Sequence, residues 1–253
     1  MGELRVHSVL VTGANRGIGL GLVQHFLGMP TPPKVVFAGC REPKGQRAQE
    51  LQNLASKHPN LVILPLDVSN PASIKAAAAT VKEHLGGSGL TLLINSAGML
   101  KITPPEDVTL EDMMQVYTTN TIGPMLMGQV FLPLLKKAAQ GSPGSALSCS
   151  KAAIINISST GGCISSPEVF DMIPIVSYHC SKAALNMLTK CQSLGYQEHS
   201  VLCVVLHPGW VQTDMGTPVT VDTSVRGMLK VISFLSEKDT GTFLNWEGKV
   251  VPW

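Results

Sequence analysis

Short apolar segments rich in β-branched residues alternate along the whole chain with longer segments whose apolar residues recur at helical spacing. Uninterrupted apolar runs are typical of strands that are buried on both faces, as in parallel sheets. The predicted strands cover residues 6–12, 34–40, 61–66, 90–95, 152–158 and 201–207, with a last one near 243–250. The predicted helices cover residues 17–28, 45–57, 71–85, 106–139, 176–198 and 224–236.

This alternation predicts an α/β fold, with a Rossmann-type, doubly wound parallel sheet of about seven strands flanked by helices. A chain of 253 residues is long enough for one such domain and short for two, and no linker-like segment divides it. We therefore expect residues 1–253 to form a single domain. The helix at 106–139 is long, and Gly123-Pro124 should bend it.

Composition narrows the class of protein. A content of 44% hydrophobic and 14% charged residues is typical of a globular chain, and a net charge of +2 gives no support for nucleic acid or a membrane surface as partner. There is neither the apolar stretch of a signal peptide nor the run of about 20 apolar residues that spans a bilayer. The six cysteines and seven histidines lack metal-ligand spacing. We expect a cytoplasmic protein with reduced thiols and no metal.

A glycine-rich turn follows the first strand, and its sequence is Thr12-Gly13-Ala14-Asn15-Arg16-Gly17-Ile18-Gly19. A strand, a glycine turn and a helix, in that order, form the context that a dinucleotide site requires. Small residues let the backbone approach a pyrophosphate, whose charge lies at the helix N-terminus. A chance glycine turn is the alternative interpretation.

The residues at the end of the second strand indicate which dinucleotide binds. An NAD enzyme would favour Asp or Glu there, to bind the ribose 2′-hydroxyl. This chain has Arg41 instead, and Arg16 lies within the glycine turn. Two guanidiniums would suit a 2′-phosphate, because arginine can bind it with two parallel hydrogen bonds. The alternative is two solvated surface arginines, but the pattern favours NADP.

Two further segments lie at predicted strand ends. Asp67-Val68 closes the third strand, where the carboxylate could accept a hydrogen bond from the adenine amino group or, alternatively, cap the next helix. Asn95-Ser96-Ala97-Gly98 closes the fourth strand, where small residues would let the chain pass over a ribose.

Tyr178 and Lys182 are one helical turn apart, and they follow a Ser158-Ser159 pair at the end of the fifth strand. A phenol has a pKa of about 10, and a neighbouring ammonium would lower it by stabilising the phenolate. Such a tyrosine can exchange a proton with a substrate oxygen that a serine hydroxyl holds. Taken alone, the Tyr-x-x-x-Lys spacing arises by chance in many helices.

Together these features resemble the short-chain dehydrogenase/reductase family over essentially the whole chain. The ordered set comprises the glycine turn, Asp67-Val68, Asn95 to Gly98, Asn120, Ile157-Ser158-Ser159, Tyr178-x-x-x-Lys182 and Pro208-Gly209-x-x-x-Thr213. The glycine turn, Cys40-Arg41 and the segment from Ser181 to Asn186 look like the carbonyl reductase branch called sniffer and C-factor. One departure is Ser96, where the family more often has a second Asn.

The resemblance implies NADPH-dependent carbonyl reduction. Tyr178 would donate the proton, Lys182 would lower its pKa and bind the nicotinamide ribose, and Ser159, rather than Ser158, would polarise the carbonyl. Asn120 would hold a water that links Lys182 to solvent. The full set of expected cofactor contacts is Gly13, Asn15, Arg16, Gly17, Ile18, Gly19, Arg41, Asp67, Val68, Asn95, Ala97, Gly98, Tyr178, Lys182, Pro208, Gly209, Val211 and Thr213.

The expected substrate pocket is built by Met99, Leu100 and residues 161–176 and 210–218. Its lining is mostly apolar and includes Cys163, Ile164, Phe170, Met172, Ile173, Trp210 and Met215. A lipophilic aldehyde, ketone or quinone would suit it, although any of these side chains could be ordinary packing. His179 and Cys180 are expected to be structural. The short segment after Thr213 predicts an open site.

Two other functions stay open. The chain could be an NADP-binding regulator without turnover, or an NAD-dependent alcohol or steroid dehydrogenase. The complete set of Ser159, Tyr178 and Lys182 disfavours the first, and the two arginines disfavour the second. The family resemblance also implies a homodimer or homotetramer, paired through the long helices after the fourth and fifth strands.

Overall fold

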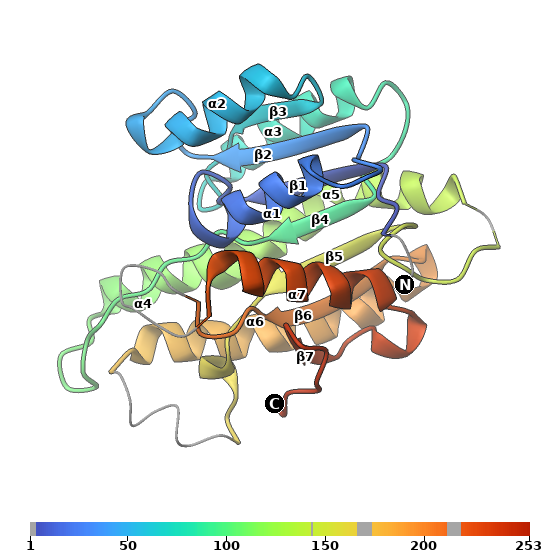
Figure 1. Cartoon of the computed structure of the whole chain (residues 1–253). Helices are drawn as coiled ribbons and strands as arrows, with labels where there is room; N and C mark the ends of the chain where they lie inside the picture. The colour runs from blue at the N-terminus through green and yellow to red at the C-terminus, as the bar shows by residue number, and fades with distance from the viewer. Residues whose placement is uncertain (1–3, 143, 166–173, 212–218) are drawn as a thin grey trace.

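Seven parallel strands form one sheet in the order β3-β2-β1-β4-β5-β6-β7. The computed structural model describes residues 4–142, 144–165, 174–211 and 219–253 (Figure 1). From the central pair β1 and β4, strands β2 and β3 follow on one side and strands β5, β6 and β7 on the other. This is the arrangement of a doubly wound sheet. The predicted fold class is confirmed.

Every predicted strand and helix has a counterpart, with bounds that differ by a few residues. The strands are β1 Ser8–Thr12, β2 Val35–Cys40, β3 Leu61–Pro65, β4 Leu92–Asn95, β5 Ala153–Ile157, β6 Leu202–His207 and β7 Phe243–Asn245. The α-helices are α1 Gly17–Leu27, α2 Gln49–Lys57, α3 Pro71–His84, α4 Leu110–Tyr117, α5 Gly123–Gln140, α6 Val176–Gly195 and α7 Val221–Phe234. The short helices are η1 Gln46–Ala48, η2 Thr118–Ile122, η3 Thr160–Gly162, η5 Gln197–His199 and η6 Glu237–Asp239.

Helices cover both faces of the sheet, which explains the uninterrupted apolar strands. Successive side chains of a strand point to opposite faces. In β1, Val9 and Val11 therefore face the core beneath α1 and α7, whereas Leu10 faces the core beneath α3 and α5 (Figure 1). All three are fully buried.

The helix predicted at 106–139 is observed from Leu110 to Gln140, as α4, the π-helix η2 and α5 in direct succession. The side chains of Thr109 and Asp112 form a capping box that starts α4 at Leu110. The π-helix η2 then leads into α5 at Gly123. A Cβ on Gly123 would lie 2.9 Å from the backbone oxygen of Val68, so this glycine also permits a close approach to the chain after β3.

The last predicted strand, near 243–250, is a short hairpin. β7 ends at Asn245, and the chain turns through Gly248, which has a φ of +86°. The backbone N–H of Val251 then donates to the carbonyl oxygen of Phe243 at 2.8 Å, and Val250 pairs with Leu244 in antiparallel sense. The returning segment covers the outer edge of β7, which would otherwise be an open sheet edge.

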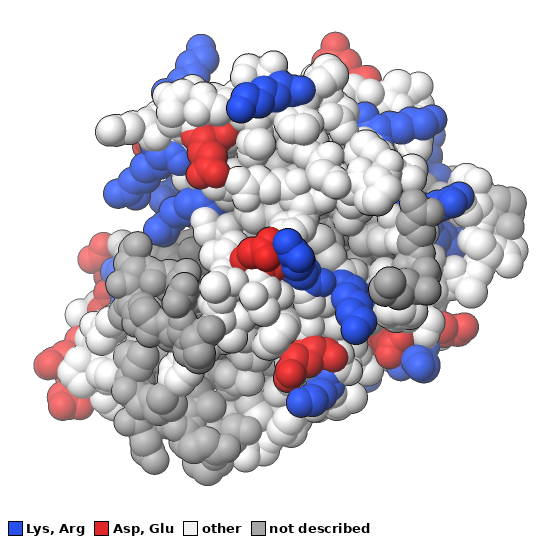
Figure 2. Space-filling view, in the orientation of Figure 1, with Lys and Arg blue, Asp and Glu red and all other residues white. Residues whose placement is uncertain are grey.

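Basic and acidic side chains are interspersed over the face seen in Figure 2, without a broad field of one sign. Among the described residues, no helix is both long and apolar enough to cross a membrane.

Candidate functional site

The carboxyl ends of the strands gather the residues singled out from the sequence, because parallel strands end at the same edge of the sheet. The glycine turn follows β1, and the Asn95–Gly98 segment follows the neighbouring β4 (Figure 1). Thr12 joins the two, since its Oγ1 accepts hydrogen bonds from the backbone N–H groups of Ser96 and Ala97, both at 3.0 Å. The segments after β1 and β4 are thus joined where the strand order reverses.

The glycine turn needs its glycines for two separate reasons. Gly13 and Gly17 have φ values of +64° and +53°, in the left-handed region that favours glycine. A Cβ on Gly13 would lie 2.8 Å from Cα of Ala97, and a Cβ on Gly19 would strike the carbonyl oxygen of Gly13. The turn therefore depends on glycine both for its backbone conformation and for its close packing against Ala97 and within itself.

The cap and first turn of α1 lack groups that would compete with an anion. Its N-cap residue, Arg16, makes no side-chain capping bond, and the first turn contains no acidic residue. Unpaired N–H groups and the positive end of the helix dipole favour a phosphate. These features fit the pyrophosphate of a dinucleotide. Asn15 and Ile18, which lie in the same turn, are half-buried.

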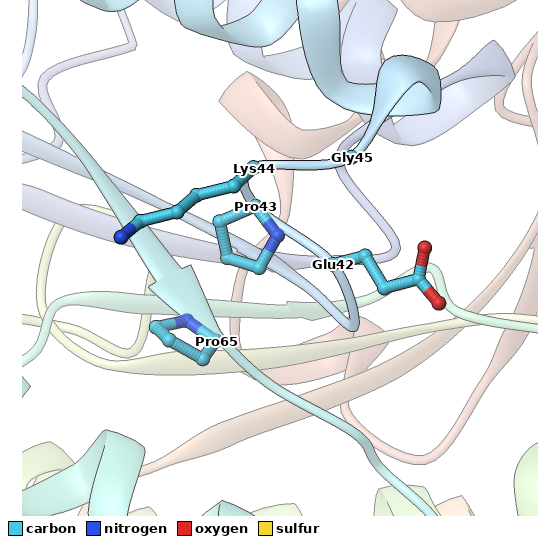
Figure 3. A pocket seen from close by; sticks show the side chains of 5 residues that line it. All are labelled: Glu42, Pro43, Lys44, Gly45 and Pro65. Carbon is cyan, nitrogen blue, oxygen red and sulfur yellow. The ribbon is translucent and has the colours of Figure 1, made fainter.

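Arg16 and Arg41 are both exposed, and within the described part of the chain neither forms an ion pair. The turn that carries Arg16 is bonded to the second strand, since the N–H of Ala14 donates to the carbonyl oxygen of Gly39 at 3.0 Å. A hollow of about 440 Å³ lies just beyond Arg41 (Figure 3). Its lining residues are Glu42, Pro43, Lys44, Gly45 and Pro65.

Asp67 does not cap α3. Its Oδ1 accepts hydrogen bonds from the backbone N–H and the hydroxyl of Ser69, at 2.9 Å and 2.6 Å. The cap of α3 is Asn70, which accepts from the N–H groups of Ala72 and Ser73. The alternative role for Asp67, as the cap of the next helix, is therefore wrong. Its contact with adenine stays a prediction.

Asn95 belongs to a buried polar network that the sequence did not reveal. Its Nδ2 donates to Oδ1 of Asn156 at 2.8 Å, and Nδ2 of Asn156 donates to Thr189 and Gln192 on α6. These amides join β4, β5 and α6 behind the site. The only sequence signal is a polar residue, Asn156, within an otherwise apolar strand, and its partners are distant in sequence.

Tyr178, Lys182 and Ser159 form one cluster at the end of β5. The Nζ of Lys182 lies 5.5 Å from the ring centre of Tyr178, so the two side chains share one side of α6 as predicted. That Nζ also donates to the carbonyl oxygen of Ile157 at 2.8 Å. Ser159 is hydrogen-bonded to Tyr178, and its Oγ accepts the N–H of Gly161 at 3.0 Å.

The two adjacent serines have different surroundings. Ser158 is 2% exposed, and its hydroxyl donates to Oδ1 of Asn186 at 2.7 Å. Ser159 is half-buried and contacts the phenol of Tyr178. Ser158 thus fastens β5 to α6, and Ser159 is the hydroxyl that reaches the cluster, while its role in polarising a carbonyl stays a prediction.

Burial dominates the electrostatics of the cluster. It raises the pKa of Tyr178 above its ordinary value, and the hydrogen bond with Ser159 acts in the opposite direction. Burial also lowers the pKa of Lys182 to about 8. The expected lowering of the Tyr178 pKa by Lys182 is therefore not found among the protein's own groups. A raised pKa keeps the phenol protonated at neutral pH, which suits a proton donor.

Asn120 is fully buried within η2 and fixes the chain beside Lys182. Its Oδ1 accepts the N–H of Met99 at 2.9 Å, and its Nδ2 donates to the carbonyl oxygen of Met99 and the hydroxyl of Ser181. A Cβ on Gly98 would lie 3.5 Å from this Oδ1 and 3.9 Å from the Lys182 Nζ. Asn120 and Lys182 thus border the same glycine, and the water expected between them stays a prediction.

The last residue of β6, His207, is a site residue that sequence reasoning missed. His207 lies beside the cluster, and burial, followed by the charge of Lys182, lowers its pKa to about 4. Its Nδ1 accepts the N–H of Thr160 at 3.4 Å, so the ring is neutral and joins two site segments. Its position directly before Pro208-Gly209 was the available signal. Val211 is 7% exposed and pairs with Val219, and Thr213 lies outside the described residues.

The expected substrate residues divide into exposed, buried and undescribed ones. Leu100, Ile164 and Trp210 are 39%, 78% and 48% exposed, whereas Cys163 is fully buried. Met99 accepts a hydrogen bond from the Thr119 hydroxyl at its sulfur. The undescribed ones are Phe170, Met172, Ile173 and Met215.

Two neighbours of Tyr178 on α6 were expected to be structural. His179 is buried, and its Nδ1 lies 2.6 Å from the carbonyl oxygen of Gly161, which fits that role. Cys180 is exposed and forms no disulfide. Within the described residues, no group of three or more His, Cys, Asp or Glu side chains could hold a metal ion.

Known proteins share both the sequence and the fold. A family profile described as short chain dehydrogenase matches residues 7–224. The crystal structure of NADPH-bound carbonyl reductase from chicken fatty liver is 68% identical, with a TM-score of 0.98 over 100% of this chain and 96% of that one. Carbonyl reductase Sniffer of Drosophila melanogaster is 38% identical, with a TM-score of 0.93 over 98% and 100% of the two chains.

A curated relative, the short-chain dehydrogenase srdF of Neurospora crassa, is 30% identical over 97% of both chains. The expected resemblance to the sniffer branch and the expected NADP cofactor both agree with these relatives. The chain therefore belongs to the short chain dehydrogenase family of oxidoreductases.

Proposed function

We propose that this chain is an NADPH-dependent reductase of lipophilic carbonyl compounds, namely aldehydes, ketones or quinones. The observation that carries the proposal is the cluster of Ser159, Tyr178 and Lys182 at the sheet edge that also holds the glycine turn. The 68% identity to an NADPH-bound carbonyl reductase supports both the cofactor and the reaction.

Each residue of the cluster has a distinct role. Bound NADPH would supply the hydride that adds to the carbonyl carbon. Ser159 donates a hydrogen bond to the carbonyl oxygen and so polarises it. Tyr178 donates the proton that the same oxygen gains, and its raised pKa keeps that proton in place at neutral pH. Lys182 binds the nicotinamide ribose and stabilises the phenolate that remains.

The proposed cofactor contacts follow the strand ends. The glycine turn holds the pyrophosphate, Arg16 and Arg41 bind the 2′-phosphate, and the hollow beyond Arg41 accepts part of the adenosine (Figure 3). Figure 3 shows the side chains of Lys44 and Glu42 extending in opposite directions from this hollow. Asp67 and the Asn95–Gly98 segment complete the adenosine side. Pro208, Gly209, Val211 and Thr213 complete the nicotinamide side.

The proposed preference for lipophilic substrates rests on exposed apolar side chains near the cluster. Leu100 follows the segment fixed by Asn120, Ile164 follows the Ser159 turn, and Trp210 follows Gly209. Apolar walls with a few polar groups are typical of small-molecule sites. An aromatic or long-chain carbonyl compound would bury this surface.

Oxidation of NADPH with a panel of quinones, isatin-like diketones and aldehydes tests the proposal. We expect turnover with several of them and lower efficiency with NADH. Binding of NADPH without turnover on any substrate would instead favour the regulator, and reduction of NAD by an alcohol or steroid would favour the dehydrogenase.

We further propose a cytoplasmic homodimer that pairs through α5 and α6. Met187 and Leu194 lie two helical turns apart on α6, and each is 65% exposed. Exposed apolar side chains on one side of a helix suit a two-fold interface. Sedimentation should give a dimer for the protein and a monomer for Met187→Lys; a monomer for both would contradict this assembly.

A further inference from the structure

The C-terminal hairpin, residues 243–253, reaches two segments that border the reacting groups. One of its tryptophans contacts the turn after β6, and another contacts the loop after β5. Neither tryptophan belongs to the catalytic cluster. The two contacts therefore affect the site indirectly, through the backbone segments that border it.

Trp246 packs against the Pro208-Gly209 turn. Gly209 has a φ of +85°, and a Cβ there would lie 2.7 Å from Nε1 and 2.8 Å from Cδ1 of the Trp246 indole. A Cβ on Gly227, in α7, would strike the same ring. The hydroxyl of Ser224 holds the turn from α7, donating to the carbonyl oxygen of Pro208 at 2.5 Å. The indole therefore lies between two glycines and fixes the backbone at Gly209.

Trp253 holds the loop that follows Ser159. Its main-chain oxygen accepts hydrogen bonds from the backbone N–H and the hydroxyl of Ser165, at 3.3 Å and 2.9 Å. Its ring stacks on Phe243 of β7, with centroids 5.8 Å apart and planes at 33°. The same Ser165 hydroxyl lies 3.4 Å from the sulfur of the fully buried Cys163.

The loop is already fixed at its other end. Gly162 lies flat against α6, since a Cβ there would be 2.6 Å from the backbone of Lys182. Nδ2 of Asn186 donates to the carbonyl oxygen of Gly162 at 3.2 Å. The contact with Trp253 is thus the second support of the segment from Ser159 to Ser165.

We propose that the hairpin is a positioning element. Trp246 fixes the turn on the nicotinamide side of the site, and Trp253 fixes the loop on the substrate side. This inference rests on the proposed carbonyl reduction for what each side binds. The two tryptophans should therefore have separable effects, because they support different segments. A hairpin that served stability alone would affect both sides together.

Steady-state kinetics of Trp253→Ala and Trp246→Ala test the separation. Trp253→Ala keeps the main-chain oxygen but removes the ring that packs on Phe243 and fixes that oxygen beside Ser165. It should raise the KM for the carbonyl substrate by about fivefold and leave the KM for NADPH within about twofold. Trp246→Ala should raise the Kd for NADPH, measured by fluorescence titration, by about fivefold and leave the carbonyl KM nearly unchanged. Trp253→Phe, which keeps a ring against Phe243, should restore the carbonyl KM. Equal effects of both alanine variants on both constants, or no effect, would overturn the proposal.

Hydrogen exchange of residues 160–165 supplies a readout that does not need turnover. Exchange in this segment should be faster in Trp253→Ala and unchanged in Trp246→Ala, and Trp246→Phe replaces the latter variant if it does not fold. If the wild-type protein reduces no carbonyl compound, the proposed function fails, while exchange and NADPH affinity still decide the role of the hairpin. Unchanged hydrogen exchange in Trp253→Ala would refute the proposed role of the hairpin.

Discussion

The glycine turn and the Ser159–Tyr178–Lys182 cluster lie at the same edge of the sheet, but they are built differently. The turn is made of backbone, in which Gly13 and Gly17 adopt positive φ values. The cluster is made of side chains from two elements, and it depends on burial and on hydrogen bonds between the end of β5 and α6.

This difference predicts different responses to substitution. A change in the turn alters the backbone path, so binding and stability respond together. A change in the cluster removes a functional group while the fold remains, so turnover responds alone. Matched substitutions in the two regions test that contrast.

The paired serines give the sharpest test within the cluster. Ser159→Ala removes the hydroxyl that polarises the carbonyl, so kcat should fall by about 10²- to 10³-fold. The free energy of unfolding should fall by only about 1 kcal/mol, from the lost hydrogen bond with Gly161. Ser158→Ala leaves Oδ1 of Asn186 without its 2.7 Å donor, so it should cost about 1–3 kcal/mol of stability and little kcat. Equal losses of kcat would contradict the division between them.

The paired glycines give the matching test in the turn. A Cβ in Gly13→Ala meets the backbone of Ala97, whereas in Gly17→Ala it meets nothing within 4 Å. We expect urea unfolding to show a loss of about 3 kcal/mol for Gly13→Ala, from strain plus a clash, and about 1 kcal/mol for Gly17→Ala, from strain alone. A cost for Gly17→Ala as large as that for Gly13→Ala would show that the close approach to Ala97 contributes little.

The two arginines test cofactor choice at the adenosine side. Arg16→Ala combined with Arg41→Ala should raise the KM for NADPH by about 30-fold and leave the KM for NADH within about twofold, because only NADPH carries the 2′-phosphate. The effect should shrink as salt rises, since both side chains are exposed. Equal changes for both cofactors would defeat the assignment.

The pH profile gives the smallest effect. Because the pKa of Lys182 is lowered to about 8, its ammonium is present below that pH and lost above it. The kcat/KM for reduction should therefore be flat at neutral pH and fall as the pH rises through about 8. Tyr178 stays protonated over this range because its pKa is raised. A profile that stays flat to pH 10 would show that the ionisation of Lys182 does not control kcat/KM.

The turn was predictable from sequence because its requirements are local. Positive φ values and a helix start are encoded by adjacent residues, so the strand–turn–helix pattern predicts Gly13 and Gly17 directly. Tyr178 and Lys182 were predictable for the same reason, since one helical turn fixes their common side.

Long-range contacts were not predictable in this way. The pKa of Tyr178 rises because the folded protein buries the phenol, an effect that spacing cannot encode. His207 and Asn156 act through partners distant in sequence. The helix predicted from residue 106 begins at Leu110, because the side chains of Thr109 and Asp112 form a capping box there.

Replacement of Tyr178 by phenylalanine tests the central claim most directly. The variant lacks only the hydroxyl, so fluorescence titration should give a Kd for NADPH within about twofold of the wild-type value. Carbonyl reduction should fall by about 10³-fold, because the variant lacks the hydroxyl that donates the proton. Full turnover by Tyr178→Phe with NADPH bound would contradict the account.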